Sequence, residues 1–202
     1  RALKKRNPEM KVLFYWANDK PKHQSKIANK AYPGAYLIHT KARKGKKDIV
    51  TKYFDVVRQE VQDWWSDAAA DAVHKYDCDG IFVDGAVAGH PKGSYAKAFG
   101  ADKAAVMNKA VFSMLADARR KIGPDKLIVF NPLHGTDGKR PPLGQEQLQV
   151  TDGAMIDDFD RNGKARQQSV EYMVNTLGAM RAAAKDGKII LFKGWPDFTM
   201  AL

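Results

Sequence analysis

The sequence is poor in the residues that build disulfides, metal sites and phosphate-binding loops. It has one cysteine, Cys78, which excludes an intrachain disulfide and any metal site made of several cysteines. Because Cys78 comes just before an apolar run, a buried hydrophobic role is favoured over a reactive thiol. The five histidines show no spacing typical of metal ligands, so no metal is predicted. No G-x-G-x-x-G or P-loop motif occurs, and no cofactor is expected.

Long hydrophobic runs are also missing. No apolar stretch approaches the roughly 18 residues that a membrane-spanning helix needs, so no membrane partner is predicted. An apolar content of 44% and a charged content of 28% are ordinary for a soluble globular protein. The length favours a single domain over residues 1–202. The chain begins with Arg1 rather than methionine, as expected of a processed or trimmed chain, and the predicted location is secreted or periplasmic.

Positive charge is concentrated at one end of the chain. Residues 1–52 contain 15 Lys and Arg against 3 Asp and Glu (+12), whereas residues 53–202 contain 19 against 20 (−1). Such an excess is typical of a solvated surface, or of binding to an anionic polysaccharide, a nucleic acid or an anionic membrane. Part of it lies in residues 41–47, a glycine-containing tip that predicts a hairpin insertion near residues 36–51. The tip lacks the interleaved aromatic residues of a strand-binding module, so nucleic acid is not the expected partner.

Short apolar runs alternate with helical patterns along the chain. The predicted strands end near Trp16, Phe54, Asp84, Asn131, Asp157 and Lys193. The predicted helices cover residues 57–76, 101–122 and about 170–187. The expected buried face of the last helix consists of Val170, Met173, Val174, Leu177 and Met180. This alternation predicts an α/β fold with a parallel sheet.

Two parallel α/β folds compete at this point. A doubly wound sheet usually carries a glycine-rich loop after its first strand, and residues 17–20 contain no glycine. Polar residues end nearly every predicted strand, which favours a (β/α)8 TIM barrel, where such residues line the active site. Because about six strands are predicted where a barrel needs eight, we expect a barrel that is incomplete or trimmed at both ends.

A motif of Asp-Gly, three apolar residues and a further Asp occurs twice, in residues 79–84 and 152–157. Each copy predicts a buried parallel strand. An unpaired carboxylate is costly to bury, and catalytic groups of barrels lie at the C-terminal ends of strands. We expect Asp84 and Asp157 to lie in register, on strands two apart, with backbones about 10 Å apart. The alternative for both is a structural carboxylate that caps a helix or pairs with a basic residue.

Residues 53–58, the pair Trp64-Trp65 and residues 79–85 together resemble the hypothetical glycosyl hydrolase families of TIM-barrel fold, and more remotely the α-galactosidase-like clan. Residues 152–159 are similar to the strand that carries the second carboxylate of those families, often a Glu. The resemblance spans roughly residues 10–195. It implies glycosidic hydrolysis with Asp84 as nucleophile and Asp157 as acid/base. Because Asp158 follows Asp157 directly, the choice between these two stays open.

Further polar and aromatic residues at strand ends or loops are candidate substrate contacts. They are Trp16, Asn18, His39, Asp55, Asn131, His134, Asp158, Lys193 and Trp195. Several have a structural alternative: Asp55 precedes a helix and could be its N-cap, and His134 could bond within its loop. For the tryptophans the alternative is packing.

The predicted function is a carbohydrate-active enzyme, a glycoside hydrolase that cleaves an oligo- or polysaccharide with two Asp carboxylates. The basic excess leaves open that this glycan is anionic. One alternative is a polysaccharide lyase acting on an anionic glycan, with His134 or a tyrosine as base. Another is a non-catalytic, glycan-binding barrel, whose binding to an anionic partner would fall steeply with salt.

Overall fold

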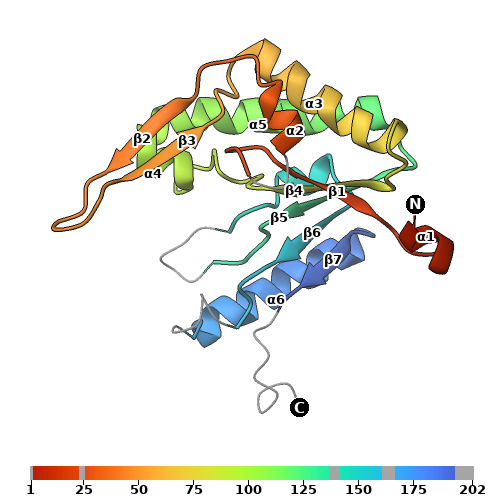
Figure 1. Ribbon diagram of the computed structural model, residues 1–202. Coiled ribbons are helices and arrows are strands. Elements are labelled where there is room, and N and C mark those ends of the chain that lie inside the picture. Colours follow the sequence, from red (N-terminus) through yellow and green to blue (C-terminus); the bar gives the residue numbers. More distant parts are fainter. Residues whose placement is uncertain (1, 23–25, 137–141, 161–166, 194–202) are drawn as a thin grey trace.

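The computed structural model describes residues 2–22, 26–136, 142–160 and 167–193. Its centre is a five-stranded sheet in the order β1-β4-β5-β6-β7, and every neighbouring pair is parallel (Figure 1). The strands are β1 (Leu13–Ala17), β4 (Gly80–Asp84), β5 (Leu127–Asn131), β6 (Gly153–Ile156) and β7 (Ile189–Phe192). The predicted α/β class with a parallel sheet is therefore confirmed.

The strand order follows the chain order without a reversal. A doubly wound sheet reverses direction at a switch point, so this sheet is wound in the manner of a barrel. Right-handed crossovers that all step in one direction place their helices on one face of the sheet. The described residues supply five strands of this sheet, where a closed barrel needs eight.

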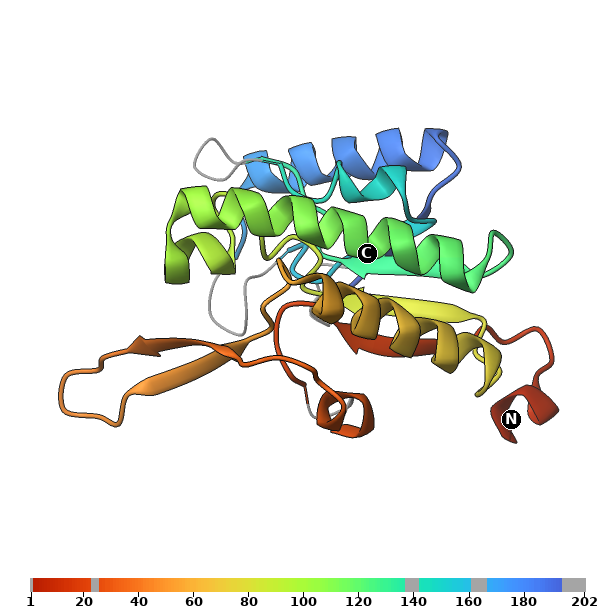
Figure 2. The same ribbon diagram turned by 90° about the horizontal axis from the view of Figure 1, so that it is seen from above.

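Three long helices connect the strands: α3 (Gln59–His74), α5 (Ala101–Ile122) and α6 (Val170–Lys185). They run roughly parallel to one another (Figure 2). Helix α5 spans the predicted residues because Gly100 and Gly123 flank it with φ of 90° and 91°, a backbone region that side chains disfavour.

The main core lies between these helices and one face of the sheet. Ile81, Val83, Ile128 and Phe130 point to this face and are fully buried. Residues two apart on a strand share a face, so the residues between them point to the opposite face, which we call the open face. No described helix is both long and apolar enough to cross a membrane.

The expected buried face of α6 is wrong in part. Val170, Val174 and Leu177 are 72%, 58% and 45% exposed, and the buried residues of α6 are instead Tyr172, Thr176 and Ala183. Helix α6 packs beside β7, the last strand of the sheet, so only one of its flanks meets the described core. A helical period locates an apolar stripe, but it does not say whether a neighbour covers that stripe.

A two-stranded antiparallel hairpin projects from the body (Figure 1). It consists of β2 (Leu37–Lys41) and β3 (Ile49–Tyr53), and we call residues 37–53 the basic hairpin. The strand expected at residues 52–55 is thus not a strand of the parallel sheet. Instead, the Phe54 backbone N–H donates to the Asp19 carbonyl (3.0 Å), which ties the hairpin to the end of β1.

The remaining elements are short. They are α1 (Ala2–Arg6), α2 (Lys26–Lys30), α4 (Ser94–Phe99) and a 3-10 helix over Gln147–Gln149. Helix α2 belongs to the loop that leaves β1, and α4 belongs to the loop that leaves β4. Both loops therefore start at the C-terminal edge of the sheet, where the polar strand-end residues lie.

Candidate functional site

The C-terminal ends of β1, β4 and β5 bring three polar side chains together. Register pairs Ala17 with Asp84 and Asp84 with Asn131. Tyr15 lies two residues before Ala17, so Tyr15, Asp84 and Asn131 share the open face. Each of the three is only half-buried, whereas Ile81, Val83, Ile128 and Phe130 on the helix-covered face are fully buried.

Asp84 accepts hydrogen bonds from three donors on three different segments. The Tyr15 hydroxyl donates to Asp84 Oδ2, and the Lys22 Nζ lies 3.3 Å from the same oxygen. The Asn131 Nδ2 donates to Asp84 Oδ1 over 3.4 Å. The Asp84 side chain keeps 23% of its surface exposed, so it is held in place and still faces solvent.

These donors decide the charge of Asp84. Burial is the largest single influence and raises the pKa of Asp84, but Tyr15, Lys22 and Asn131 together outweigh it and leave that pKa below its ordinary value. Burial and then the bond to Asp84 raise the pKa of Tyr15, which therefore stays a protonated donor. At neutral pH this arrangement presents an ionised carboxylate, the state that a nucleophile or a general base requires.

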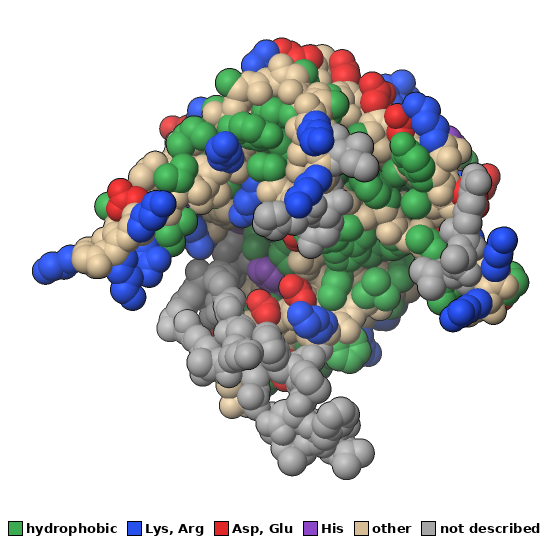
Figure 3. All heavy atoms as spheres, viewed as in Figure 1, with side chains coloured by type: hydrophobic (Ala, Val, Ile, Leu, Met, Phe, Trp, Pro, Cys, Tyr) green, Lys and Arg blue, Asp and Glu red, His purple; other side chains and the backbone are tan. Residues whose placement is uncertain are grey.

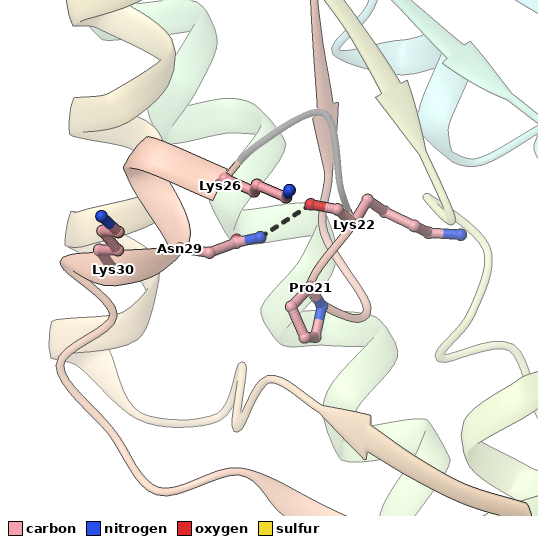
Figure 4. Close-up of a pocket in the computed structure, with 5 residues that line it drawn as sticks. All are labelled: Pro21, Lys22, Lys26, Asn29 and Lys30. Carbon is pink, nitrogen blue, oxygen red and sulfur yellow. Dashed lines mark hydrogen bonds between the residues drawn. The ribbon is translucent and has the colours of Figure 1, made fainter.

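Lys22 reaches Asp84 from the loop that follows β1. The Asn29 Nδ2 donates to the Lys22 carbonyl (3.0 Å) and so fastens the loop to α2 (Figure 4). In Figure 4 the Lys22 side chain points toward β4, away from Lys26. The hollow behind it, of about 370 Å³, is lined by Pro21, Lys22, Lys26, Asn29 and Lys30. The backbone carbonyl of Lys22 thus helps to fix the loop, while its ammonium pairs with Asp84.

A second carboxylate, Asp19, lies next to Asp84. Asp19 is 3% exposed, and its Oδ2 is 3.2 Å from the Lys20 Nζ. A Cβ at Gly85 would come within 2.7 Å of Asp19 Oδ1, so only glycine allows this approach. Burial raises the pKa of Asp19, and the charge of Asp84 adds to this. Environments that push the pKa values of two neighbouring carboxyls apart are typical of catalytic sites.

Several buried polar atoms around this pair have no hydrogen-bond partner within the described part of the chain. They are both amide atoms of Asn18, Oδ1 of Asp19 and Oδ1 of Asn131. A buried polar atom without a partner costs about 1–3 kcal/mol, and such atoms in native proteins commonly meet water or a ligand. Asn18 was a predicted substrate contact, and it lies 0% exposed beside Gly85, beneath the surface of the site.

Asp157 does not lie level with Asp84, contrary to the expected register. Val129 pairs with Gly153 and Phe130 with Ala154, so the ladder places Met155 opposite Asn131. Asp157 is therefore displaced toward the C-terminal end by two residues. Its Oδ1 is 3.2 Å from the Lys193 Nζ, and its side chain is 42% exposed. The two predicted catalytic residues share the open face without touching one another.

The other predicted contacts are spread more widely. Trp16 is 0% exposed and packs in the core, where its indole N–H donates to the Trp65 carbonyl (2.9 Å). His39 lies on the basic hairpin, 6.3 Å between ring centroids from Phe99 of α4. Of these two positions, only His39 is at a surface that a ligand could reach.

Four further predicted contacts lie in loops or outside the described residues. Asp55 is not the N-cap of α3, because Arg58 occupies that position. The backbone N–H of Asp55 donates to the Tyr32 hydroxyl (2.9 Å). His134 follows β5, where its N–H and carbonyl pair with Leu143. The Asp158 carbonyl accepts from Gln168 Nε2 (3.0 Å). Trp195 lies outside the described residues.

No cluster of three or more metal-binding side chains occurs among the described residues. Tyr15, Lys22 and Asp19 are the site residues that sequence patterns did not indicate. For Tyr15 a signal existed, because its alternation with Trp16 along β1 requires that one of the two faces away from the helices.

Comparison with known proteins identifies relatives by family and by fold. The model of hypothetical glycosyl hydrolase family 15 matches residues 4–197. No curated protein sequence matches the chain.

Among solved structures, the chain is similar to the chitinase domain of the spore coat protein CotE from Clostridium difficile, at 16% identity and a TM-score of 0.54. This match covers 96% of the chain and 51% of that domain's chain. A chitinase from Rhizomucor miehei matches at 17% identity and a TM-score of 0.45, over 68% of this chain and 44% of the other. At such identities the first likeness shows the fold alone, and the chain spans about half the length of that relative.

Proposed function

The chain belongs to the hypothetical glycosyl hydrolase family 15, and from this premise we propose that it is a glycoside hydrolase acting on an oligo- or polysaccharide. The observation that carries the proposal is the ionised Asp84, which three donors hold at the C-terminal edge of a parallel sheet. Catalytic groups lie at this edge in barrel enzymes. The chitinase domain with a similar fold supports a glycan as the substrate class.

In this proposal Asp84 is the base or the nucleophile. Glycoside hydrolysis needs one carboxylate near the anomeric carbon and one carboxylic acid that protonates the leaving oxygen. Asp84 meets the first need because its bonds to Tyr15, Lys22 and Asn131 favour the charged form. The hydroxyl of Tyr15 would also hold the Asp84 oxygen that it touches in a fixed orientation.

The proposed acid is Asp157. It lies on the open face and two strands from Asp84, beyond its level by two residues, which puts the two backbones about 12 Å apart. Side chains that lean toward one another across this distance fit the separation of about 6.5–9.5 Å in inverting enzymes better than the 5–5.5 Å of retaining ones. The proposal is thus inversion, with Asp84 activating a water molecule and Asp157 protonating the leaving group.

The lyase alternative receives no support from the family, whose name denotes hydrolysis. A lyase would abstract a proton from the glycan and leave an unsaturated product, which the proposed hydrolysis does not form. The glycan-binding alternative differs from the proposal in one measurable respect, because it predicts binding without any product.

The proposal is tested with a panel of neutral and acidic oligosaccharides. We expect the protein to release new reducing ends from at least one of them, and Asp84→Asn to lower kcat on the order of 10²–10⁴-fold. Proton NMR of the first product then reports the anomer, and inversion is expected. Circular dichroism shows whether Asp84→Asn keeps the fold. An Asp84→Asn protein with the wild-type rate contradicts the proposal.

A further inference from the structure

The basic hairpin is the part of the molecule that the proposed function leaves unexplained. It stands away from the body in two perpendicular views (Figures 1 and 2). Its strands are about 17 Å long, and the hairpin meets the body near its root, through the buried Tyr53, the partly buried Leu37 and the His39 ring. Ile38, Ile49 and Val50 are 52%, 45% and 59% exposed. An element that buries so little of its own surface contributes little to the stability of the core.

The charge of this hairpin is not compensated. Residues 41–47 contain five basic side chains and no acidic one, and all of them are exposed. The next residue, Asp48, accepts from the backbone N–H of Arg43 (3.2 Å). None of these five side chains takes part in an ion pair that the described residues form, whereas Lys20, Lys22 and Lys121 of the body each pair with an Asp. Figure 3 shows the basic side chains gathered at the tip.

One face of the hairpin forms a corner with α4 and the start of α5. His39 and Lys41 are two residues apart and share this face. The ring of Phe99 lies 6.3 Å from the His39 ring and 5.5 Å from the Tyr53 ring, and the Lys103 Nζ lies 5.1 Å from its centroid. The corner therefore combines a half-buried aromatic ring with the Lys103 ammonium close to it and Lys41 on the same face of the hairpin, a composition suited to a sugar ring that carries an acidic group.

The hairpin is continuous with the candidate site. The Phe54 backbone N–H donates to the carbonyl of Asp19, beside Asp84. The Lys20 Nζ lies 5.4 Å from the centroid of the Tyr53 ring and pairs with Asp19. A glycan bound at Asp84 that extends toward the hairpin would therefore lie near the Lys20 ammonium before it reaches the basic tip. The arrangement extends an electrostatic attraction from the site outward.

We propose that the basic hairpin and its corner with Phe99 form a binding arm for an acidic glycan, one that carries carboxylate or sulfate groups along its length. This inference rests on the proposed function and narrows its substrate class. The two are complementary in charge. A flexible polyanion can form ion pairs with several of these cations at once, and the described residues supply no acidic partners for them.

Other polyanions fit the arm less well. A single-stranded nucleic acid would need exposed aromatic rings for base stacking, and the exposed apolar residues of the hairpin are Ile and Val. An anionic membrane would favour large apolar residues at the outermost point, whereas residues 42–47 are all Lys or Arg apart from Ala42 and Gly45. Both remain outcomes that the experiment below separates.

The test measures binding rather than turnover, in an Asp84→Asn background that keeps the glycan intact. One variant removes three charges from the tip (Lys44→Gln, Lys46→Gln, Lys47→Gln), and a matched control removes three exposed charges from other elements (Lys5→Gln, Lys109→Gln, Lys185→Gln). Ligands are polygalacturonate, heparin, a neutral glucan, a thymidine homopolymer and phosphatidylserine vesicles. Polygalacturonate and heparin distinguish carboxylate from sulfate recognition.

We expect polygalacturonate or heparin to bind with an affinity that falls steeply with salt, and the tip variant to lose on the order of tenfold at low salt. The matched control should lose much less, and the neutral glucan should be indifferent to both variants. An equal loss in tip variant and control would show a net-charge effect and overturn the proposal. So would tighter binding of DNA or vesicles than of either glycan. Hydrolysis of neutral glycans only, with no acidic glycan bound, would overturn this inference and leave the proposed function standing.

Discussion

The two copies of the Asp-Gly motif share one role and differ in the other. In both, the first aspartate holds a backbone N–H at the start of a neighbouring strand: Asp79 accepts from Val12 (2.7 Å) and Asp152 from Ile128 (2.6 Å). Each also pairs with a basic side chain, Asp79 with Lys4 and Asp152 with Arg119. The first aspartate of each copy therefore has a structural role, because it fixes the start of a neighbouring strand.

The second aspartates meet different surroundings. Asp84 lies between two neighbouring strands, and both supply a donor, Tyr15 from β1 and Asn131 from β5. Asp157 lies one residue beyond the end of β6, and its Oδ1 is 3.2 Å from the Nζ of Lys193, which follows β7. The motif thus places a carboxylate at a strand end, while the neighbouring segments determine the contacts and the exposure of that carboxylate.

The largest expected difference between the two is in catalysis. Asp84→Asn should lower kcat on the order of 10²–10⁴-fold with every substrate, because it removes the base. Asp157→Asn should cost as much with a poor leaving group, but much less with an activated aryl glycoside, which leaves without protonation. Steady-state rates on such a substrate pair measure this. Equal losses of Asp157→Asn on both substrates would contradict its role as the acid.

A second contrast concerns the donors. Tyr15→Phe removes a hydrogen bond that favours the charged form of Asp84, so the pKa of Asp84 should rise. Because the base must be ionised, the acid limb of the pH–kcat/KM profile should move to higher pH, and the rate at the optimum should fall roughly tenfold. Lys193→Gln, next to Asp157, is the matched control and should leave that limb in place. An unchanged limb in Tyr15→Phe would show that Tyr15 does not set the charge of Asp84.

The smallest difference is expected for the first aspartates, which should behave alike. Asp79→Ala and Asp152→Ala each leave a backbone N–H without its acceptor and should lower the free energy of unfolding by about 1–3 kcal/mol. Urea unfolding followed by circular dichroism measures this. Turnover per folded molecule should stay near the wild-type value in both, and a selective loss of turnover in one of them would give that aspartate a catalytic role.

Local patterns predicted the elements well where the chain itself sets the boundary. Helix α5 is flanked by Gly100 and Gly123 and contains no glycine between them. The apolar runs of β4 and β5 are long enough to be recognised as strands. The exposure of Val174 and Leu177 could not be predicted, because it depends on which neighbours cover α6. The spacing of apolar residues in a sequence predicts an apolar stripe on a helix, whereas the burial of that stripe depends on the assembled fold.

The candidate site was predictable only in its centre. Asp84 follows from its position at the end of an apolar run, but its contact with Tyr15 spans 69 residues and leaves no local mark. The offset of Asp157 follows from the stagger between β5 and β6, which depends on how the two strands pack and not on either sequence alone. Asp19 was missed because its burial depends on the close approach of Gly85 from another strand end.

The charge of Asp84 is central to the proposed mechanism. Carbon-13 NMR of the Asp84 carboxyl, in protein labelled at aspartate and assigned with Asp84→Asn, reports its pKa directly. We predict a pKa below the ordinary value of 3.8, and a rise of that pKa in Tyr15→Phe. A carboxylate whose pKa is lowered on folding stabilises the fold at pH values above its unfolded pKa, and this stabilisation is lost as the pH falls through the folded pKa. The free energy of unfolding should therefore fall less on acidification in Asp84→Asn than in the wild type. An Asp84 pKa at or above the ordinary value, unchanged in Tyr15→Phe, would contradict the account.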